Sequence, residues 1–395
     1  MKAIHQYLER YAEAEAQELS QQLKLWPESA RYKQVLVIPV YDESDEFIQR
    51  LRHSKLGQQT LLIAVVNRPD NISDCPANDV FLLKLSSTFE QRWQHHQLQL
   101  LSHPSLDILL VDRHQHPIPH KQGVGLARKL GCDLAASLIH QGIIESSWIH
   151  SSDADAELPE DYFQTDALDH NYAAATYSFD HKRGGDPVAI ATQLYQQTLW
   201  DYVNGLESAG SPYAFHTIGS IIAVNYAHYC QARGFPKRAG GEDFYLLNKL
   251  RKLGRVAQLP ALITLTPRLS HRVPFGTGPA TAKILESLEN NQPITTYDPI
   301  LFERLGQCLN IIELAIRQQQ PPADACLQLP SETRAALEQL GVNKCFSHLE
   351  QSRDAKMKLQ HFHDWMDAFR TLKFVRLLQA NHYPNIPLPT ESQPH

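Results

Sequence analysis

Three continuous apolar runs constrain the fold of this chain more than any other feature. They cover residues 35–40, 60–67 and 106–112, and each ends in a polar turn. Runs of this length are typical of strands that helices cover on both faces, as in the parallel sheet of an α/β protein. Ligands of such open sheets bind beyond the carboxyl ends of the strands. The polar turns therefore predict where a functional site would lie.

A fourth, shorter apolar run ends close to two carboxylates. Residues 148–151 read as a strand, and Asp153 and Asp155 follow it. Alternate residues of an extended strand point to the same face, so we expect both carboxylates to face one way. Mg²⁺ typically uses one or two carboxylates together with substrate phosphates. We interpret the pair as ligands of Mn²⁺ or Mg²⁺ that hold a diphosphate. The alternative is an ordinary loop, in which Asp is common.

A glycine-containing segment upstream of this pair could approach a phosphate. Gly123 and Gly125 permit close backbone approach, and Arg128 lies about one turn into the helix that follows. The start of a helix presents donors that suit phosphate. The alternative is an ordinary helix start on a basic, solvated face.

Two acidic residues follow two glycines at the expected start of another helix. They are Glu242 and Asp243. Acidic residues at this position cap a helix or interact favourably with its dipole. In the functional interpretation, Asp243 is a general base aimed at an acceptor hydroxyl, and Glu242 holds substrate.

In this order the segments resemble the family 2 glycosyltransferases and their relatives, which share the GT-A fold. The matching segments are residues 38–43, 123–131, 153–155 and 219–247, and the resemblance spans residues from about 33 to 280. It implies an α/β protein with a mostly parallel sheet flanked by helices. It also implies transfer of a sugar from a nucleotide-sugar donor to an acceptor hydroxyl, assisted by Mn²⁺ or Mg²⁺.

Carried over residue by residue, the resemblance implies a role for each motif. The residues that would line the nucleoside pocket or lie near the nucleotide are Pro39, Tyr41, Glu43, Asp70, Lys121 and Arg128. Asp153 and Asp155 would hold the nucleotide through the metal, and Asp243 would be the base. If Asp243 deprotonates an acceptor that attacks from the far face, the anomeric centre inverts, which is the outcome we expect. If Asp243 only binds the acceptor, a retaining route stays open.

A histidine and an arginine precede a glycine-containing loop within residues 270–278. Histidine is a common ligand of transition metals, and arginine can neutralise a diphosphate in a bidentate way. The position resembles the one from which several GT-A enzymes, including the glucosyl-3-phosphoglycerate synthases, supply a third metal ligand. We therefore expect His271 to bind the metal and Arg272 to contact phosphate. Alternatively, His271 is an ordinary surface or core residue in a chain with 20 histidines.

Two further segments are candidates for substrate contacts. Residues 179–187 are basic and glycine-rich, so they either suit an anionic acceptor or form a plain surface loop. Aromatic faces pack well against apolar ring faces, and one part of the chain is rich in rings that could stack on a sugar. About half of them are expected to be ordinary core. They are Trp200, Tyr202, Tyr213, Phe215 and His216.

The sequence divides into four segments. Residues 1–32 read as a polar helical leader, 33–295 as the catalytic domain, 296–381 as a helical C-terminal region, and 382–395 as a disordered, Pro-rich tail. The apolar stripes of the C-terminal helices predict core packing or a contact between the subunits of a homo-oligomer.

Composition argues against several classes of protein. The 37 basic and 43 acidic residues give a net charge of −6, so no nucleic-acid surface is predicted. No apolar run approaches the roughly 18 residues of a membrane span, and the N-terminus lacks the apolar core of a signal peptide. The six cysteines are scattered, as expected in a reducing compartment. We expect a cytoplasmic enzyme whose acceptor is soluble, or lipid-linked and met at the membrane surface.

Two other functions fit part of the pattern. A nucleotidyltransferase acting on a sugar phosphate also uses an α/β sheet and a carboxylate-bound metal. It would carry a glycine-rich, basic loop after its first strand, where this chain has residues 39–43. The other alternative is a non-catalytic nucleotide-sugar-binding protein of the same fold. The two intact pairs of acids, Asp153 with Asp155 and Glu242 with Asp243, argue against it.

Overall fold

The computed structural model describes residues 2–269, 276–352 and 354–389. The chain forms two compact units. Unit 1 combines Met1–Lys182 with Thr217–Pro279, and unit 2 combines Arg183–His216 with Ala280–His395. None of the described helices is long and apolar enough to cross a membrane.

The central strands of unit 1 are the apolar runs of the sequence. β1 (Gln34–Val40) pairs in parallel with β2 (Thr60–Pro69) and with β6 (Trp148–Ser151). β2 pairs in parallel with β5 (Leu106–Ile118) on its other side. Most residues of these strands are buried, as in a sheet that is covered on both faces. The prediction of an α/β protein with a large, mostly parallel sheet flanked by helices is confirmed.

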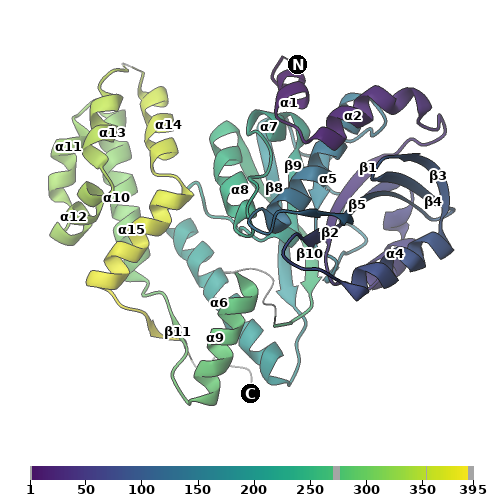
Figure 1. Ribbon diagram of the computed structural model, residues 1–395. Helices are drawn as coiled ribbons and strands as arrows, with labels where there is room; N and C mark the ends of the chain where they lie inside the picture. The colour runs from purple at the N-terminus through teal and green to yellow at the C-terminus, as the bar shows by residue number, and fades with distance from the viewer. Residues whose placement is uncertain (1, 270–275, 353, 390–395) are drawn as a thin grey trace. The chain divides into compact units, whose positions relative to one another are not determined.

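Further strands extend the sheet on both sides (Figure 1). Beyond β5 lies an antiparallel hairpin of β3 (Glu90–His95) and β4 (Leu98–His103). Beyond β6, β9 runs antiparallel to both of its neighbours, β6 and β8, so β6 and β8 point the same way. β10 is parallel to β8 and therefore to β1 as well. These strands are β9 (Ile222–Asn225), β8 (Tyr172–His181), β10 (Arg255–Leu265) and the short β7 (Ala156–Glu157).

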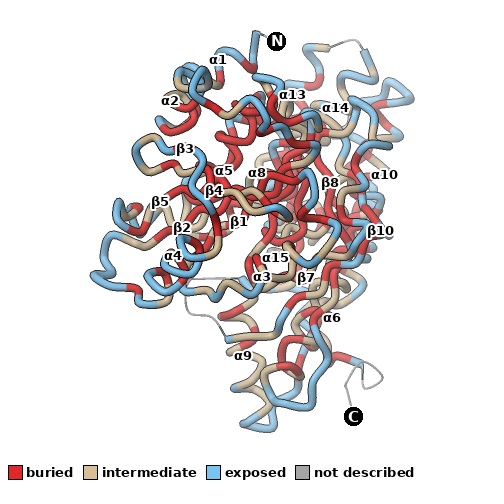
Figure 2. Tube along the Cα trace, turned by 90° about the vertical axis from the view of Figure 1, so that its right-hand side faces the viewer, coloured by how far each residue is buried: buried red, intermediate tan, exposed pale blue. Residues whose placement is uncertain are grey.

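Helix α5 (Gly123–His140) packs against β1 and β2 and is buried along most of its length, as Figure 2 shows in red. The two elements approach closely at Gly131, where an added Cβ would lie 2.3 Å from Cγ1 of Val37. The other helices of unit 1 are α1 (Lys2–Arg10), α2 (Ala14–Gln22), α3 (Glu46–His53), α4 (Pro76–Thr88), α7 (Tyr226–Gln231) and α8 (Glu242–Leu253), with short 3-10 turns at Leu23–Leu25, Lys55–Gly57 and Gly219–Ile221.

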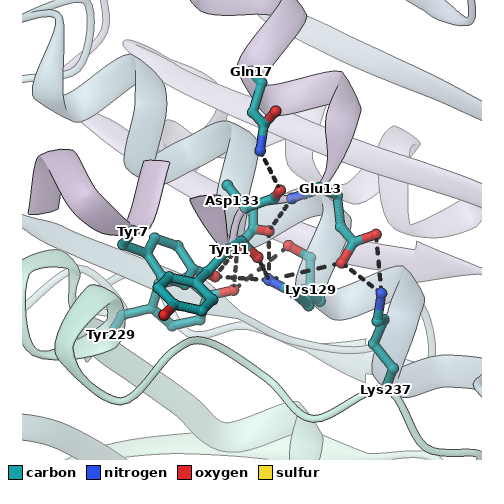
Figure 3. A network of polar contacts seen from close by, with 9 residues as sticks. Tyr7, Tyr11, Glu13, Gln17, Lys129, Asp133, Tyr229 and Lys237 are labelled. Carbon is teal, nitrogen blue, oxygen red and sulfur yellow. Dashed lines mark hydrogen bonds and ion pairs between the residues drawn. The ribbon is translucent and has the colours of Figure 1, made fainter. Parts of the chain in front are cut away.

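The N-terminal segment is anchored on α5 by a buried polar network (Figure 3). The carboxylate of Asp133 accepts hydrogen bonds from the hydroxyls of Tyr7 and Tyr229, the second at 2.7 Å. It also accepts from the backbone amide of Glu13 at 2.8 Å. Nζ of Lys129 lies 2.7 Å from the same carboxylate. The expected leader is therefore packed into unit 1, with α1, α2, α5 and α7 joined by one network.

The charges in this network balance each other. Burial raises the pKa of Asp133, whereas the ammonium group of Lys129 lowers it. Two opposite charges out of water are stable only when their mutual attraction and further hydrogen bonds offset the cost of desolvation. Here the two tyrosine hydroxyls and a backbone amide supply those hydrogen bonds.

We predict that Asp133→Ala lowers the free energy of unfolding by about 3–5 kcal/mol, because the buried ammonium group of Lys129 then loses its close counter-ion and is left with Glu13 at 3.9 Å. Urea denaturation followed by tryptophan fluorescence measures the change. Lys237→Ala is the matched control: its side chain is 43% exposed, and its ammonium group pairs with Glu13 at 3.1 Å. An exposed pair of this kind contributes at most ~1 kcal/mol. An unchanged denaturation midpoint for Asp133→Ala would contradict the prediction.

Unit 2 is built mainly from helices around a separate apolar core. The helices are α6 (Pro187–Ser208), α9 (Thr277–Glu289), α10 (Ile300–Arg317), α11 (Pro322–Ala325), α12 (Ser331–Gln339), α13 (Val342–Leu349), α14 (Ala355–Trp365) and α15 (Ala368–Asn381), with a 3-10 turn at Cys326–Gln328. A small antiparallel pair joins β11 (Thr295–Thr296) to β12 (Ile386–Pro387).

The chain departs from the expected segments in two places. The sequence predicts residues 183–216 as part of the catalytic domain, but they belong to unit 2. The cause is close packing of α6 on α10: an added Cβ on Gly205 would lie 2.4 Å from the ring of Phe302. The tail expected to be disordered from residue 382 instead contains β12, and the amide of Leu388 donates to the carbonyl of Ile294 at 2.8 Å. Residues 390–395 lie outside the described part of the chain.

Candidate functional site

Five carboxylates gather at one edge of the sheet of unit 1. β1, β6 and β10 run in the same direction, so the segments after them leave the sheet at the same edge. Glu43 comes from the loop after β1, two acids follow β6, and two begin α8 after Gly241, which has a left-handed backbone with φ 71°. We call this set the acidic edge. It consists of Glu43, Asp153, Asp155, Glu242 and Asp243.

The guanidinium group of Arg128 connects two parts of the acidic edge. Its Nη2 donates to Asp153 at 2.6 Å, and its Nε donates to Glu242 at 3.0 Å. Its Nη1 donates to the hydroxyl of Ser151 at 2.9 Å and to the carbonyl of Ser152 at 3.2 Å. The side chain is only 3% exposed. Arg128, expected near the nucleotide, is thus a buried counter-charge for two acids.

A second arginine, Arg268, connects two more acids of the edge. Its Nη1 lies 2.7 Å from Glu43, and its Nε lies 2.8 Å from Asp155. Sequence reasoning missed this residue. The available signal was a basic residue three positions after β10, at the carboxyl end of a strand.

The structure corrects the reason given for pairing Asp153 with Asp155. β6 ends at Ser151, so the two acids lie in a loop and not on an extended strand. Each carboxylate binds a different arginine, Arg128 or Arg268. The two carboxylates are still close enough to interact: after burial, the charge of Asp153 is the next largest cause that raises the pKa of Asp155.

Burial and neighbouring carboxylates shift the pKa values of the acidic edge upward. Burial, followed by the charge of Asp153, raises the pKa of Asp155 to about 6, although Arg268 opposes the shift. Burial, followed by the charge of Glu242, raises the pKa of Asp243 to about 8. Burial also raises the pKa of Glu242. Among the described residues, the ion pairs of Arg128 and Arg268 reach four of these five carboxylates.

The metal set expected from the sequence is described only in part. His271 and Arg272 lie outside the described residues. Among the residues that the structure describes, three ligand atoms within 4.8 Å of one another are found at Glu18, His95 and His96, and not at the acidic edge. Asp153 and Asp155 therefore have no third described ligand at that spacing.

The residues expected around the nucleotide lie along the same edge of the sheet. Pro39 is in β1, and the loop after it holds Tyr41. That loop turns at Asp42, which has a positive φ of 55° and whose amide donates to Asn78 at 3.0 Å.

Asp70 follows β2, and its carboxylate contacts His120, the residue before Lys121. The carboxylate of Asp70, about half exposed, accepts a hydrogen bond from the amide of His120 at 2.9 Å. Lys121, the next residue, is exposed. The pair lies at the carboxyl ends of the strands, as the sequence predicts.

The aromatic residues proposed to stack on a sugar belong to unit 2, together with His216. The ring of Tyr202 lies 5.2 Å from that of Tyr297 and packs on the apolar core. Tyr213 is buried and its hydroxyl donates to the carbonyl of His363 at 3.2 Å. Burial lowers the pKa of His216 to about 4, which keeps its imidazole neutral. Tyr202 and Tyr213 are therefore structural.

Comparison with known proteins gives little support at the level of sequence. No family model matches the chain, and no curated protein matches it. One solved structure with similarity is a mannosyltransferase from Pyrobaculum calidifontis in complex with GDP-Man and Mn²⁺. It has 15% sequence identity and a TM-score of 0.39, and the alignment covers 93% of this chain and 95% of that one. At this level of similarity the neighbour carries no weight for the site, whose chemistry follows from its own side chains.

Gly219 makes the position of Arg128 testable, because an added Cβ on Gly219 would lie 2.3 Å from Nη2. We predict that Gly219→Ala displaces the guanidinium group and destabilises the protein in the same direction as Arg128→Met. The Arg128→Met change leaves acids buried without a counter-charge and should cost about 3–5 kcal/mol. Thermal denaturation compares the variants.

Gly185→Ala is the matched control for this prediction. Nothing lies within 4 Å of the Cβ added there, and its φ is not in the left-handed region. If Gly219→Ala melts at the same temperature as Gly185→Ala, Arg128 does not occupy the position described.

Proposed function

We propose that this chain is a metal-dependent glycosyltransferase with the GT-A fold, which moves a sugar from a nucleotide-diphosphate donor to an acceptor hydroxyl. The observation that supports it most is the gathering of the five carboxylates of the acidic edge at the carboxyl ends of the strands. A divalent cation would relieve the repulsion among these carboxylates. Open α/β sheets bind ligands at this edge.

Asp153 and Asp155 would hold Mn²⁺ or Mg²⁺. Their side chains are 33% and 21% exposed, so solvent reaches both. Asp153 binds Arg128 through Oδ1 and Asp155 binds Arg268 through Oδ2, so each carboxylate has a second oxygen for a metal. Such hard oxygen ligands suit both cations. The bound cation would stabilise the charge that develops on the departing diphosphate. We propose His271 as a third ligand and Arg272 as a phosphate contact.

The nucleoside end of the donor would lie along the ends of β1 and β2. Pro39, Tyr41 and Glu43 would line the pocket, with Asp70 near the base or ribose and Lys121 near the phosphates. Glu43 is held by Arg268 at 2.7 Å, so the nucleoside pocket and the metal ligand Asp155 share one arginine. This shared contact would couple donor binding to metal binding.

Asp243 would be the general base. Its carboxylate is held by the amide of Phe244 at 2.7 Å. A base must lose its proton before it can accept one from a hydroxyl, and an effective base has a pKa near the working pH. Burial and the charge of Glu242 bring the pKa of Asp243 into that range. With such a base on the far face of the sugar, transfer would invert the anomeric centre.

We predict that Mn²⁺ strengthens the binding of a nucleoside diphosphate and that Asp155→Ala removes this gain, by about tenfold or more. Calorimetric titration with a panel of nucleoside diphosphates, with and without Mn²⁺, measures it. Asp166→Ala, which changes an exposed acid, is the control. Identical wild-type affinities with and without Mn²⁺ would remove the metal from the proposal.

We predict that Asp243→Asn leaves donor binding intact and lowers the rate of transfer by roughly 10²–10⁴-fold. In the wild type only the deprotonated form is active, so the rate should rise with pH and level off above about 8. Release of nucleoside diphosphate from nucleotide sugars, with a panel of acceptors, measures both effects. Full transfer by Asp243→Asn would place the base elsewhere. Synthesis of a nucleotide sugar from a nucleoside triphosphate would instead identify a nucleotidyltransferase, and binding without turnover a binding protein.

A further inference from the structure

A second group of metal-ligand side chains lies away from the acidic edge. Glu18 is on α2, and His95 and His96 are at the end of β3 and in the turn to β4 (Figure 1). Their ligand atoms lie within 4.8 Å of one another. All three residues belong to unit 1. Two imidazoles and a carboxylate therefore converge from segments about 75 residues apart in the chain.

The hairpin turn adopts a backbone conformation that brings the two histidines together. His96 is the first of the two residues between β3 and β4, and it has a positive φ of 49°. Two-residue hairpin turns need a positive φ there and usually have Gly or Asn. Adjacent side chains on a strand point to opposite faces. Because the chain turns at His96, the rings of His95 and His96 lie 4.3 Å apart.

Neighbouring contacts hold this turn against α2. Nε2 of Gln97, the other turn residue, donates to Glu15 at 3.2 Å. Glu15 also pairs with Arg113 on β5 at 3.3 Å. Glu15 and Glu18 are three residues apart in one helix and so lie on the same face. The contact through Glu15 therefore positions Glu18 opposite the two histidines.

In the described part of the chain, no hydrogen bond or ion pair uses the carboxylate of Glu18 or either imidazole. The three side chains therefore face one another, and no other described side chain bonds to them. Glu18 and His95 are half-buried and His96 is exposed, so an ion can reach them from solvent. A bound ion would explain why a histidine occupies a turn position that favours glycine.

We propose that Glu18, His95 and His96 form a binding site for a divalent transition metal of the Zn²⁺ type. Imidazole nitrogens favour Zn²⁺, Ni²⁺ and Cu²⁺ over Mg²⁺ and Ca²⁺, and a set of two histidines and one glutamate is an established Zn²⁺ ligand set. Water would complete the coordination. The site differs from the oxygen ligands of the acidic edge, and it does not depend on the proposed transferase activity.

The metal would tie the N-terminal helices to the edge of the sheet. α2 carries Glu18, and the edge strand β3 carries His95. The same two regions already meet where the ring of Trp26 lies 5.3 Å from that of Trp93. A ligand that binds only the folded state raises its stability. Zn²⁺ should therefore protect residues 1–26 from proteolysis.

Calorimetric titration with Zn²⁺ tests the site in the full chain. We expect His95→Ala and Glu18→Gln each to weaken Zn²⁺ binding by at least about tenfold. His96→Asn should do the same, while Asn keeps the left-handed turn. His170→Ala is the matched control, because His170 is an exposed histidine in another part of unit 1. It should bind Zn²⁺ as the wild type does.

A second measurement separates ligand loss from misfolding. The melting temperature without metal should be unchanged in His96→Asn, whereas the rise caused by Zn²⁺ in the wild type should be lost. If all three variants keep wild-type Zn²⁺ affinity, or if His170→Ala loses as much affinity as they do, the proposal is wrong.

Discussion

The acidic edge depends on the buried guanidinium group of Arg128. It links α5, the loop after β6 and the start of α8 through Asp153 at 2.6 Å and Glu242 at 3.0 Å. Taking such a charge out of water costs several kcal/mol unless partners surround it. The carboxylates of Asp153 and Glu242 are those partners, and their bonds to Arg128 fix their own positions as well. Their positions relative to the sheet are therefore set by the fold itself, before any ligand binds.

Helix α5 carries a second set of buried charges directly after the first. Lys129 and Asp133 contact the N-terminal segment and α7, whereas Arg128 contacts the acidic edge. The same helix thus connects the N-terminal helices with the site. The hydroxyl of Tyr7 reaches Asp133 only when α1 is packed in place. Residues 1–32, which the sequence predicts as a helical leader, therefore help to hold α5, the helix that carries Arg128.

The sequence was a good guide where burial acts locally and a poor one where distant residues meet. The strands β1, β2 and β5 follow from their apolar runs, because burial on both faces requires such composition. The partners of the arginines could not be predicted: Arg128 and Glu242 are 114 residues apart, and Arg268 and Glu43 are 225 apart. Only the folded sheet brings them together. The prediction that Asp153 continues a strand was wrong for a related reason. β6 ends at Ser151, and the next carbonyl, that of Ser152, accepts a hydrogen bond from the distant Arg128.

The two buried charge clusters of α5 differ in how their carboxylates are satisfied, and this difference supports the proposal that the acidic edge binds a cation. Around Asp133, the ammonium group of Lys129 and several hydrogen bonds satisfy the carboxylate. At the acidic edge, burial and then the neighbouring carboxylates raise the pKa of Asp155 and of Asp243 despite two arginines. Such repulsion is relieved either by protons or by a cation, which compete for the same oxygens. A cluster whose charges are balanced stabilises the fold, whereas repulsion among carboxylates favours the binding of a cation, as we propose for the acidic edge.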